Sequence, residues 1–178
     1  MQTNLQKAFP DLLILAYCDD VSIVGPPEQA AEAYRRWSYA VSTRLQGSLR
    51  DEKGAIFSPQ HSHQQLKEFG APESMSFSSE GIKILGAPIG TKRFIKSFME
   101  AKVTELEADM ETIARMPSLQ AQWILNVKAL QHRLNYLFRC TACGDRADYS
   151  DLATRYDSTI LSVPVSYTHL TLPTTPYV

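Results

Sequence analysis

The chain has 178 residues, of which 44% are hydrophobic and 21% charged. This composition is typical of a globular protein with a sizeable core, and it excludes a disordered chain. The formal net charge is -1, so any binding of nucleic acid has to come from local basic patches and not from an overall attraction.

The beginning of the chain predicts a hairpin that carries acids at its turn. Residues 1–10 are polar and are expected to be irregular. Two short apolar runs, residues 12–17 and 21–24, then flank Asp19 and Asp20. Clustered carboxylates at such a turn suit a hard divalent cation. Because neighbouring residues of a strand point to opposite faces, only one of the two acids is expected to be a primary metal ligand.

A helix and a polar region are expected next. Apolar residues recur at helical spacing over residues 28–44, and Gly47 is a suitable stop. Residues 55–57 predict a short strand. Residues 61–79 are rich in Ser, Gln and His and are expected to form a surface loop with one short strand over residues 74–77.

The rest of the chain predicts one strand and two long helices. The strand covers residues 82–85 and ends at Gly86. One amphipathic helix begins near Phe94 and ends before Pro117, and a second covers residues 119–137. The short break between them favours an antiparallel helical pair, so the fold class is expected to be α+β. The aromatic residues of the second helix are expected in the core; they are Trp123, Tyr136 and Phe138.

The cysteines and the apolar runs indicate a location. Three cysteines, Cys18, Cys140 and Cys143, cannot form a fully paired disulfide framework, which favours a reducing compartment, either nucleus or cytoplasm. No apolar run approaches the roughly 20 residues that span a bilayer, so no membrane role is expected. The last two cysteines have zinc-knuckle spacing, but no second ligand pair follows, and we interpret this spacing as coincidence.

Three blocks in one order carry a resemblance to a known family. The first is Tyr17-Cys18-Asp19-Asp20 between its apolar runs, the second is residues 49–59 around Lys53, and the third is residues 81–90 with Leu85 and Gly86. Together they resemble the metal hairpin, the lysine-bearing segment and the primer grip of reverse transcriptases of the non-LTR retrotransposon type, over residues 9–139. The resemblance implies a partial palm followed by a thumb. It also implies an RNA-directed DNA polymerase, a nucleotidyltransferase that uses two Mg²⁺ ions, an RNA template, a DNA primer and deoxynucleoside triphosphates.

The resemblance assigns a role to each candidate residue. Asp19 would bind metal with support from Asp20, and Tyr17 would pack beside the primer end. Lys53 would protonate the departing pyrophosphate as a general acid, although a solvated lysine beside two acids is an equal alternative. Leu85 and Gly86, in the third block, would hold the primer strand near the protein backbone. A plain turn after a strand is the alternative.

Basic residues of the second helix are candidates for contacts with nucleic acid. Lys128 and Arg133 could contact phosphates of a template-primer duplex, as a thumb does. A solvated helix face explains them equally well.

The expected division of the chain follows from these blocks. Residues 1–90 are the partial palm, 91–145 the thumb-like helices and 146–164 a segment of uncertain role. Residues 165–178 resemble the translation of a sequencing adapter, because GTC TCT TAT ACA CAT CTG ACG CTG CCG ACG encodes Val165 to Thr174, and we interpret them as an artefact tail.

Three readings of the chain stay open. The family's first aspartate block lies upstream of the metal hairpin, so the chain alone is expected to be an inactive fragment. It could also be a degenerate retroelement remnant that only binds nucleic acid or protein. A fragment of another magnesium-dependent phosphotransfer enzyme is the third possibility, and it predicts that carboxylates from Asp11, Asp51 or Glu52 converge on Asp19.

Overall fold

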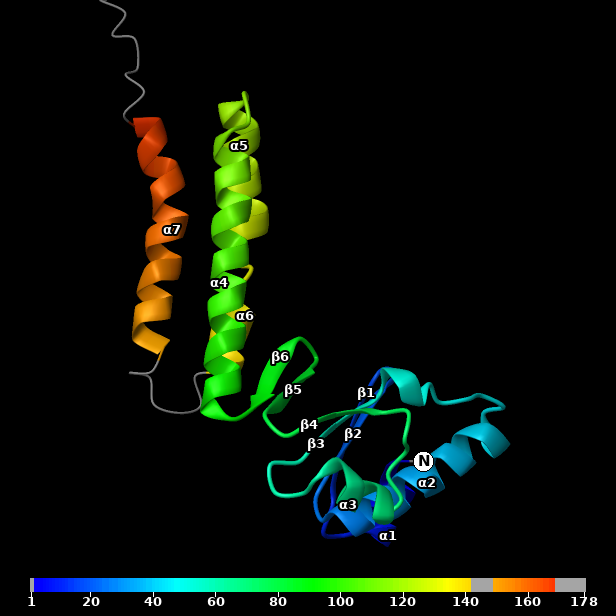
Figure 1. Cartoon of the computed structure of the whole chain (residues 1–178). Coiled ribbons are helices and arrows are strands. Elements are labelled where there is room, and N and C mark those ends of the chain that lie inside the picture. Colours follow the sequence, from blue (N-terminus) through cyan, green and yellow to red (C-terminus); the bar gives the residue numbers. More distant parts are fainter. Residues whose placement is uncertain (1, 142–148, 169–178) are drawn as a thin grey trace, which may run out of the picture. The chain divides into compact units, whose positions relative to one another are not determined.

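The computed structural model describes the backbone of residues 2–141 and 149–168 and the side chains of residues 5–141 and 149–162. The chain divides into two compact units, Met1–Ile82 and Lys83–Val178. Figure 1 shows the elements of both, and each unit is described by itself.

The first unit begins with a helix, a hairpin and a second helix: α1 (Gln2–Ala8), β1 (Leu13–Tyr17), β2 (Asp20–Val24) and α2 (Pro27–Arg44). The two strands pair antiparallel, from Leu13 opposite Val24 to Tyr17 opposite Asp20. The predicted hairpin and helix are confirmed. The expectation of an irregular start is wrong for residues 2–8, which form α1. Gln6 explains why, because its side chain accepts a hydrogen bond from the backbone N–H of Ile14 (3.2 Å) and so fixes α1 to β1.

One face of the hairpin packs against both helices, and the other lies open. Leu12 and Ile14 are buried together with Leu5 of α1 and Ala33 of α2. The alternate residues Leu13, Leu15 and Tyr17 are each more than half exposed. This is the period of two that a strand with one buried face shows.

The helix α2 ends where expected, but the residue with the unusual backbone conformation is not the glycine. The helix stops at Arg44, and the backbone N–H groups of Leu45 and Gly47 both donate to the carbonyl of Val41. The residue in the left-handed conformation is Gln46, with φ 51°, and not Gly47. The predicted end of the helix is therefore confirmed, but Gly47 is not the residue that needs an unusual backbone conformation.

The polar region of the first unit is more ordered than predicted. After the short helical turn η1 (Asp51–Lys53) come β3 (Ala55–Phe57), α3 (His63–Glu68) and β4 (Ser76–Ser78), and β3 pairs with β4 in parallel. The strand at 55–57 is confirmed, and the expectation of a loop is wrong over α3. Ser62 and Gln65 form a reciprocal capping box, and Leu66 is buried, so this short helix has both a start signal and an apolar anchor.

The second unit consists of a hairpin and a group of helices. Its elements are β5 (Gly81–Ile84, which begins at the end of the first unit), β6 (Ala87–Gly90), α4 (Lys92–Ala114), α5 (Leu119–Leu125), the π-helical turn η2 (Asn126–Leu130), α6 (Asn135–Thr141) and α7 (Ser150–Thr168). The strand at 82–85 and the first long helix are confirmed. The strand β6 was not predicted, because Pro88 and Gly90 are rare inside strands.

The core of the second unit lies along α4. A stripe of apolar side chains on α4 is buried against α5, η2, α6 and α7; the stripe is Met99, Val103, Leu106, Met110 and Ile113. Figure 1 shows α7 running beside α4, so a third helix joins the expected pair, and the first residues of the expected tail, 165–168, lie in α7. The rest of that tail lies outside the described residues.

The prediction of one continuous second helix is wrong. The π-helical turn interrupts it, with the N–H of Gln131 donating to the carbonyl of Asn126 (2.9 Å), and a further turn precedes α6. Strands followed by helices confirm the α+β fold class.

Candidate metal and nucleic-acid site

The hairpin places Tyr17, Asp19 and Asp20 at one tip. Tyr17 is the last residue of β1 and Asp20 the first of β2, and Cys18 and Asp19 form the turn between them. Cys18 has a positive φ of 52°, an uncommon conformation for a residue other than glycine. Because directly opposed residues share a face, the Asp20 side chain lies on the open face of the ribbon, beside Tyr17.

The negative charge at this tip is not compensated. Tyr17, Cys18, Asp19 and Asp20 are all exposed, and Tyr17 keeps 66% of its surface. Within the described part of the chain, no lysine, arginine or histidine forms an ion pair with either aspartate. Mg²⁺ is commonly bound through one or two carboxylates and keeps several water ligands, so the two acids fit one part of a magnesium site.

The carboxylates expected by the phosphotransfer alternative do not converge on Asp19. Among the described residues there is no group of three or more His, Cys, Asp or Glu side chains that could hold a metal ion. Asp51 instead accepts a hydrogen bond from the hydroxyl of Tyr34 on α2. Partial burial raises the pKa of Tyr34, and the hydrogen bond to Asp51 raises it further, so the hydroxyl stays protonated and remains the donor. The Tyr34–Asp51 bond therefore fixes η1 to α2.

Lys53 lies at the end of η1 with its side chain exposed. No described hydrogen bond or ion pair brings its ammonium group to the hairpin acids. The next residue, Gly54, has a packing role: a Cβ there would lie 2.9 Å from the side chain of Met75. Packing against Met75 is therefore a local reason for glycine after Lys53. Lys53 lies in the same compact unit as Asp19 and Asp20, but on a different segment of the chain.

Leu85 and Gly86 form the turn between β5 and β6. Both have positive φ, 49° and 86°, which is the backbone of a type I′ hairpin turn. The carbonyl of Leu85 accepts a hydrogen bond from the Tyr136 hydroxyl of α6 (3.1 Å), and the neighbouring Cys140 thiol raises the pKa of Tyr136. No atom lies within 4 Å of a Cβ built on Gly86. The turn is thus held by α6 on one side and open at the glycine.

The two basic candidates differ in their surroundings. Arg133 forms ion pairs with two carboxylates of α4, those of Glu105 (2.7 Å) and Asp109. Lys128 lies on η2, is exposed, and pairs with no acid in the described segments. A phosphate could therefore reach Lys128 directly, whereas Arg133 would first have to leave its two partners.

Several contacts could not be found by sequence reasoning. Arg155 of α7 binds Glu107 through two nitrogens and also the hydroxyl of Thr104.

The prediction of a buried aromatic set is wrong for Trp123 and Tyr136, each about half exposed. Sequence spacing alone could not reveal this, because the interruption at η2 changes which face of the segment meets the core.

Two of the three cysteines lie in the part of the chain that the structure describes. Cys18 and Cys140 are exposed and unpaired. Cys143 lies outside the described residues.

No protein-family model, curated protein or solved structure matches the chain. Among the described helices, none is long and apolar enough to cross a bilayer.

Proposed function

We propose that this chain is a palm and thumb portion of an RNA-directed DNA polymerase of the non-LTR retrotransposon type. The observation that carries the proposal is the hairpin tip, where Asp19 and Asp20 stand exposed between two paired strands, with no described cation to neutralise them. Adjacent uncompensated carboxylates repel each other, so a site of this kind is stabilised by a bound divalent cation.

The residues of the tip have separate roles in this proposal. When bound, two Mg²⁺ ions would activate the attacking hydroxyl and stabilise the leaving pyrophosphate. Asp19 would hold metal at the turn, Asp20 would support it from the start of β2, and Tyr17 would line the open face where the primer end packs. Lys53 would donate a proton to the pyrophosphate.

The second unit supports the proposal through its open turn. The backbone at Gly86 is free of neighbours in the described structure, which is the access that a primer strand needs. Lys128 is exposed and available for a phosphate, which would add a salt-dependent contact.

Metal binding by the chain itself is the first test. We expect Mn²⁺, used as a paramagnetic probe in place of Mg²⁺, to broaden the amide NMR signals around Tyr17 to Val21 selectively. Asp19→Asn should remove this broadening. Asp157→Asn, which removes an exposed acid from α7, should leave it unchanged. Equal broadening at both sites in the native chain would mean that no specific cation site exists at the tip.

Polymerase chemistry is tested in the gene product that contains this chain together with an upstream aspartate block. We expect magnesium-dependent primer extension on an RNA template. Asp19→Asn should lower its rate by at least about 100-fold, since even groups that only support a metal ligand are worth 10–100-fold. Tolerance of Asp19→Asn would favour a remnant that only binds.

A further inference from the structure

The segment formed by α5 and η2 exposes apolar residues and buries polar ones. Leu119, Trp123 and Ile124 are each about half exposed. Gln122 and Asn126 are the only buried polar residues in the described part of the chain, and the Asn126 side-chain oxygen has no hydrogen-bond partner there. A surface helix normally has the reverse arrangement, because burial of apolar surface stabilises the fold and burial of an unpaired polar atom does not. The orientation of α5 therefore needs a separate cause.

The buried amide of Gln122 provides that cause. Its Nε2 donates to the carbonyl of Met116 (2.5 Å) and to that of Ala114 (3.4 Å), at the end of α4 and in the turn after it. Carbonyls at the end of a helix have no partner within the helix, so an amide that reaches them stabilises this end. Because Gln122 faces α4, the next two residues, Trp123 and Ile124, are turned away from it by about 100° and 200°.

The exposed side chains form one continuous face along α5 and η2. Leu119 and Trp123 are four residues apart, as are Ile124 and the exposed Lys128, and residues four apart are neighbours on a helix surface. The half-buried Val127 lies four residues after Trp123. An exposed apolar face of this kind is typical of an interaction site, and tryptophan is enriched among the residues that contribute most to binding.

The charge of this face favours an acidic partner. Lys128, at its end, forms no ion pair within the described segments, and the sequence has no aspartate or glutamate from residue 112 to residue 144. Of the nearby acids on α4, Glu105 and Asp109 already bind Arg133. If a second copy of the chain placed the same face against this one, it would bring another lysine and no carboxylate. A partner that neutralises Lys128 therefore has to supply an acid of its own.

We infer that this face of α5 and η2 is a docking surface for an amphipathic helix of another protein, one whose apolar stripe is flanked by carboxylates. Aliphatic residues three and four positions apart on that helix would cover Trp123 and Ile124, and an acid at its edge would pair with Lys128. Nucleic acid suits the face less, because Leu119 and Ile124 have no ring on which a base can stack. Docking of a helix is independent of the proposed polymerase function, but it would exclude a phosphate from Lys128.

Two synthetic peptides test the face. Both are helices of about 18 residues, or five turns, with the same leucine stripe, which is flanked by glutamates in one peptide and by lysines in the other. In a Trp37→Phe background, Trp123 is the only tryptophan. We expect the glutamate peptide to shift its emission to shorter wavelength, because the covered indole leaves water. This peptide should bind about 1.5- to 5-fold more tightly than the lysine peptide, the range for one exposed ion pair.

Matched variants separate the contributions of charge and of apolar contact. Lys128→Glu should reverse the preference between the two peptides, whereas Lys96→Glu changes an exposed lysine on α4 of the same unit and should leave the preference unchanged. Ile124→Ser should weaken binding of the glutamate peptide by about 5-fold or more, as truncation of an important interface residue does. Ile124 is half exposed, so the fold should persist, which circular dichroism can verify.

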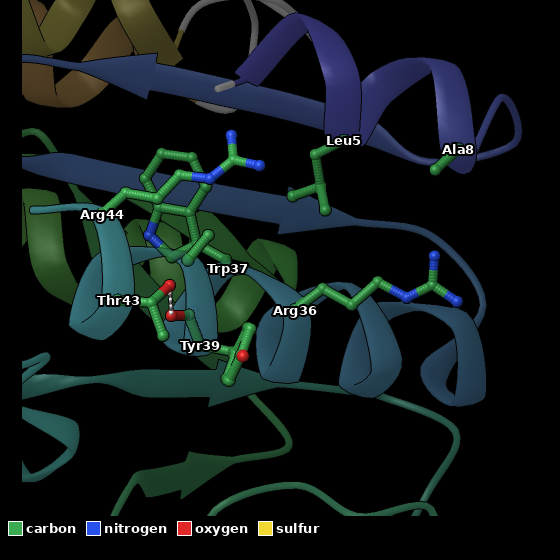
Figure 2. A pocket seen from close by; sticks show the side chains of 8 residues that line it. Leu5, Ala8, Arg36, Trp37, Tyr39, Thr43 and Arg44 are labelled. Carbon is green, nitrogen blue, oxygen red and sulfur yellow. Dashed lines mark hydrogen bonds between the residues drawn. The ribbon is translucent and has the colours of Figure 1, made fainter.

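The first unit provides a control for unspecific binding of apolar peptides. Figure 2 shows Trp37 in the wall of a groove between α1 and α2, together with Leu5 and Arg44. The groove has a volume of about 280 Å³, less than one turn of a helix about 10 Å wide occupies. In a Trp123→Phe background, neither peptide should therefore change the emission of Trp37. An equal response of both tryptophans would mean that the peptides do not select α5, and it would overturn the inference.

Three other outcomes would also overturn it. They are an unchanged preference in Lys128→Glu, a dimer in sedimentation whose Trp123 is already shielded, which would assign the face to a second copy, and a response of Trp123 to an oligonucleotide but to neither peptide. The peptides are measured without metal or template, and Asp19→Asn should bind them like the native chain. Failure of the polymerase proposal and failure of helix docking therefore give different results.

Discussion

The turn between β5 and β6 allows a test of why its second residue is glycine. Gly86 has φ 86°, a conformation that costs a residue with a Cβ about 1–2 kcal/mol. A Cβ at Gly86 would meet no atom within 4 Å, so no steric clash adds to this cost. We therefore expect Gly86→Ala to lower the free energy of unfolding of the second unit by about 1–2 kcal/mol, entirely through the backbone.

Urea denaturation followed by tryptophan fluorescence measures this loss. In a Trp37→Phe background the remaining tryptophan, Trp123 of α5, reports on the second unit alone. Each kcal/mol should also lower the melting temperature by about 4–8 °C for a unit of this size. Gly86→Asn is the matched variant, because asparagine tolerates positive φ better than alanine although it is larger.

The relative stabilities of the native chain, Gly86→Ala and Gly86→Asn decide why glycine is needed. If backbone conformation is the reason for glycine, Gly86→Asn costs less than Gly86→Ala. A larger loss with asparagine would refute this reasoning, because it would mean that space around the turn limits the residue. If close approach of a primer is also required, both variants weaken binding of a template-primer duplex, and asparagine does so more.

Three further predictions concern the elements around the candidate sites. Arg155 lowers the pKa of Glu107 from its usual 4.5, so the stabilisation from this pair is present above about pH 4.5 and is lost as the pH falls toward the lowered pKa. Thermal melts against pH should show that Arg155→Ala lowers the melting temperature at pH 7 and removes this acid dependence, and a parallel pH profile in both proteins would contradict it. Met99 is 0% exposed, and Met99→Ala should cost about 2–5 kcal/mol in urea denaturation, where a loss below about 1 kcal/mol would mean that the core of the second unit is not packed around it. Ser62→Ala removes the capping box of α3 and should cost about 0.5–2 kcal/mol, seen as faster amide hydrogen exchange in α3, while unchanged exchange would mean that the buried Leu66 alone holds the helix.

Local patterns were sufficient to predict much of the fold. The hairpin at Asp19 was predictable because two short apolar runs surround a polar break, and α2 and α4 because apolar residues recur at helical spacing. The capping residues Ser62 and Gln65 also gave a readable signal for α3, but the polar composition around them masked it. Local sequence thus carries the elements whose hydrogen bonds are local.

Contacts between distant segments could not be predicted in the same way. Arg133 reaches Asp109 across 24 positions, and Tyr34 reaches Asp51 across 17, and neither residue type specifies its partner. The interruption at Asn126 was missed because the apolar spacing continues through it, and only the backbone shows the wider turn.

The π-helical turn makes the length of the chain at this point significant. Its bond from Gln131 to Asn126 spans five residues where an α-helix spans four, so the segment contains one residue more than a regular helix needs. Deleting a single residue there would allow regular α-helical bonding and, because the wider turn already absorbs the extra residue, would leave the following segment in nearly the same orientation. Tyr136 would then still face Leu85. Loss of one residue from positions 126–130 is therefore expected to preserve the contact that holds the β5–β6 turn, whereas the same deletion inside α4 would rotate the residues after it by about 100°.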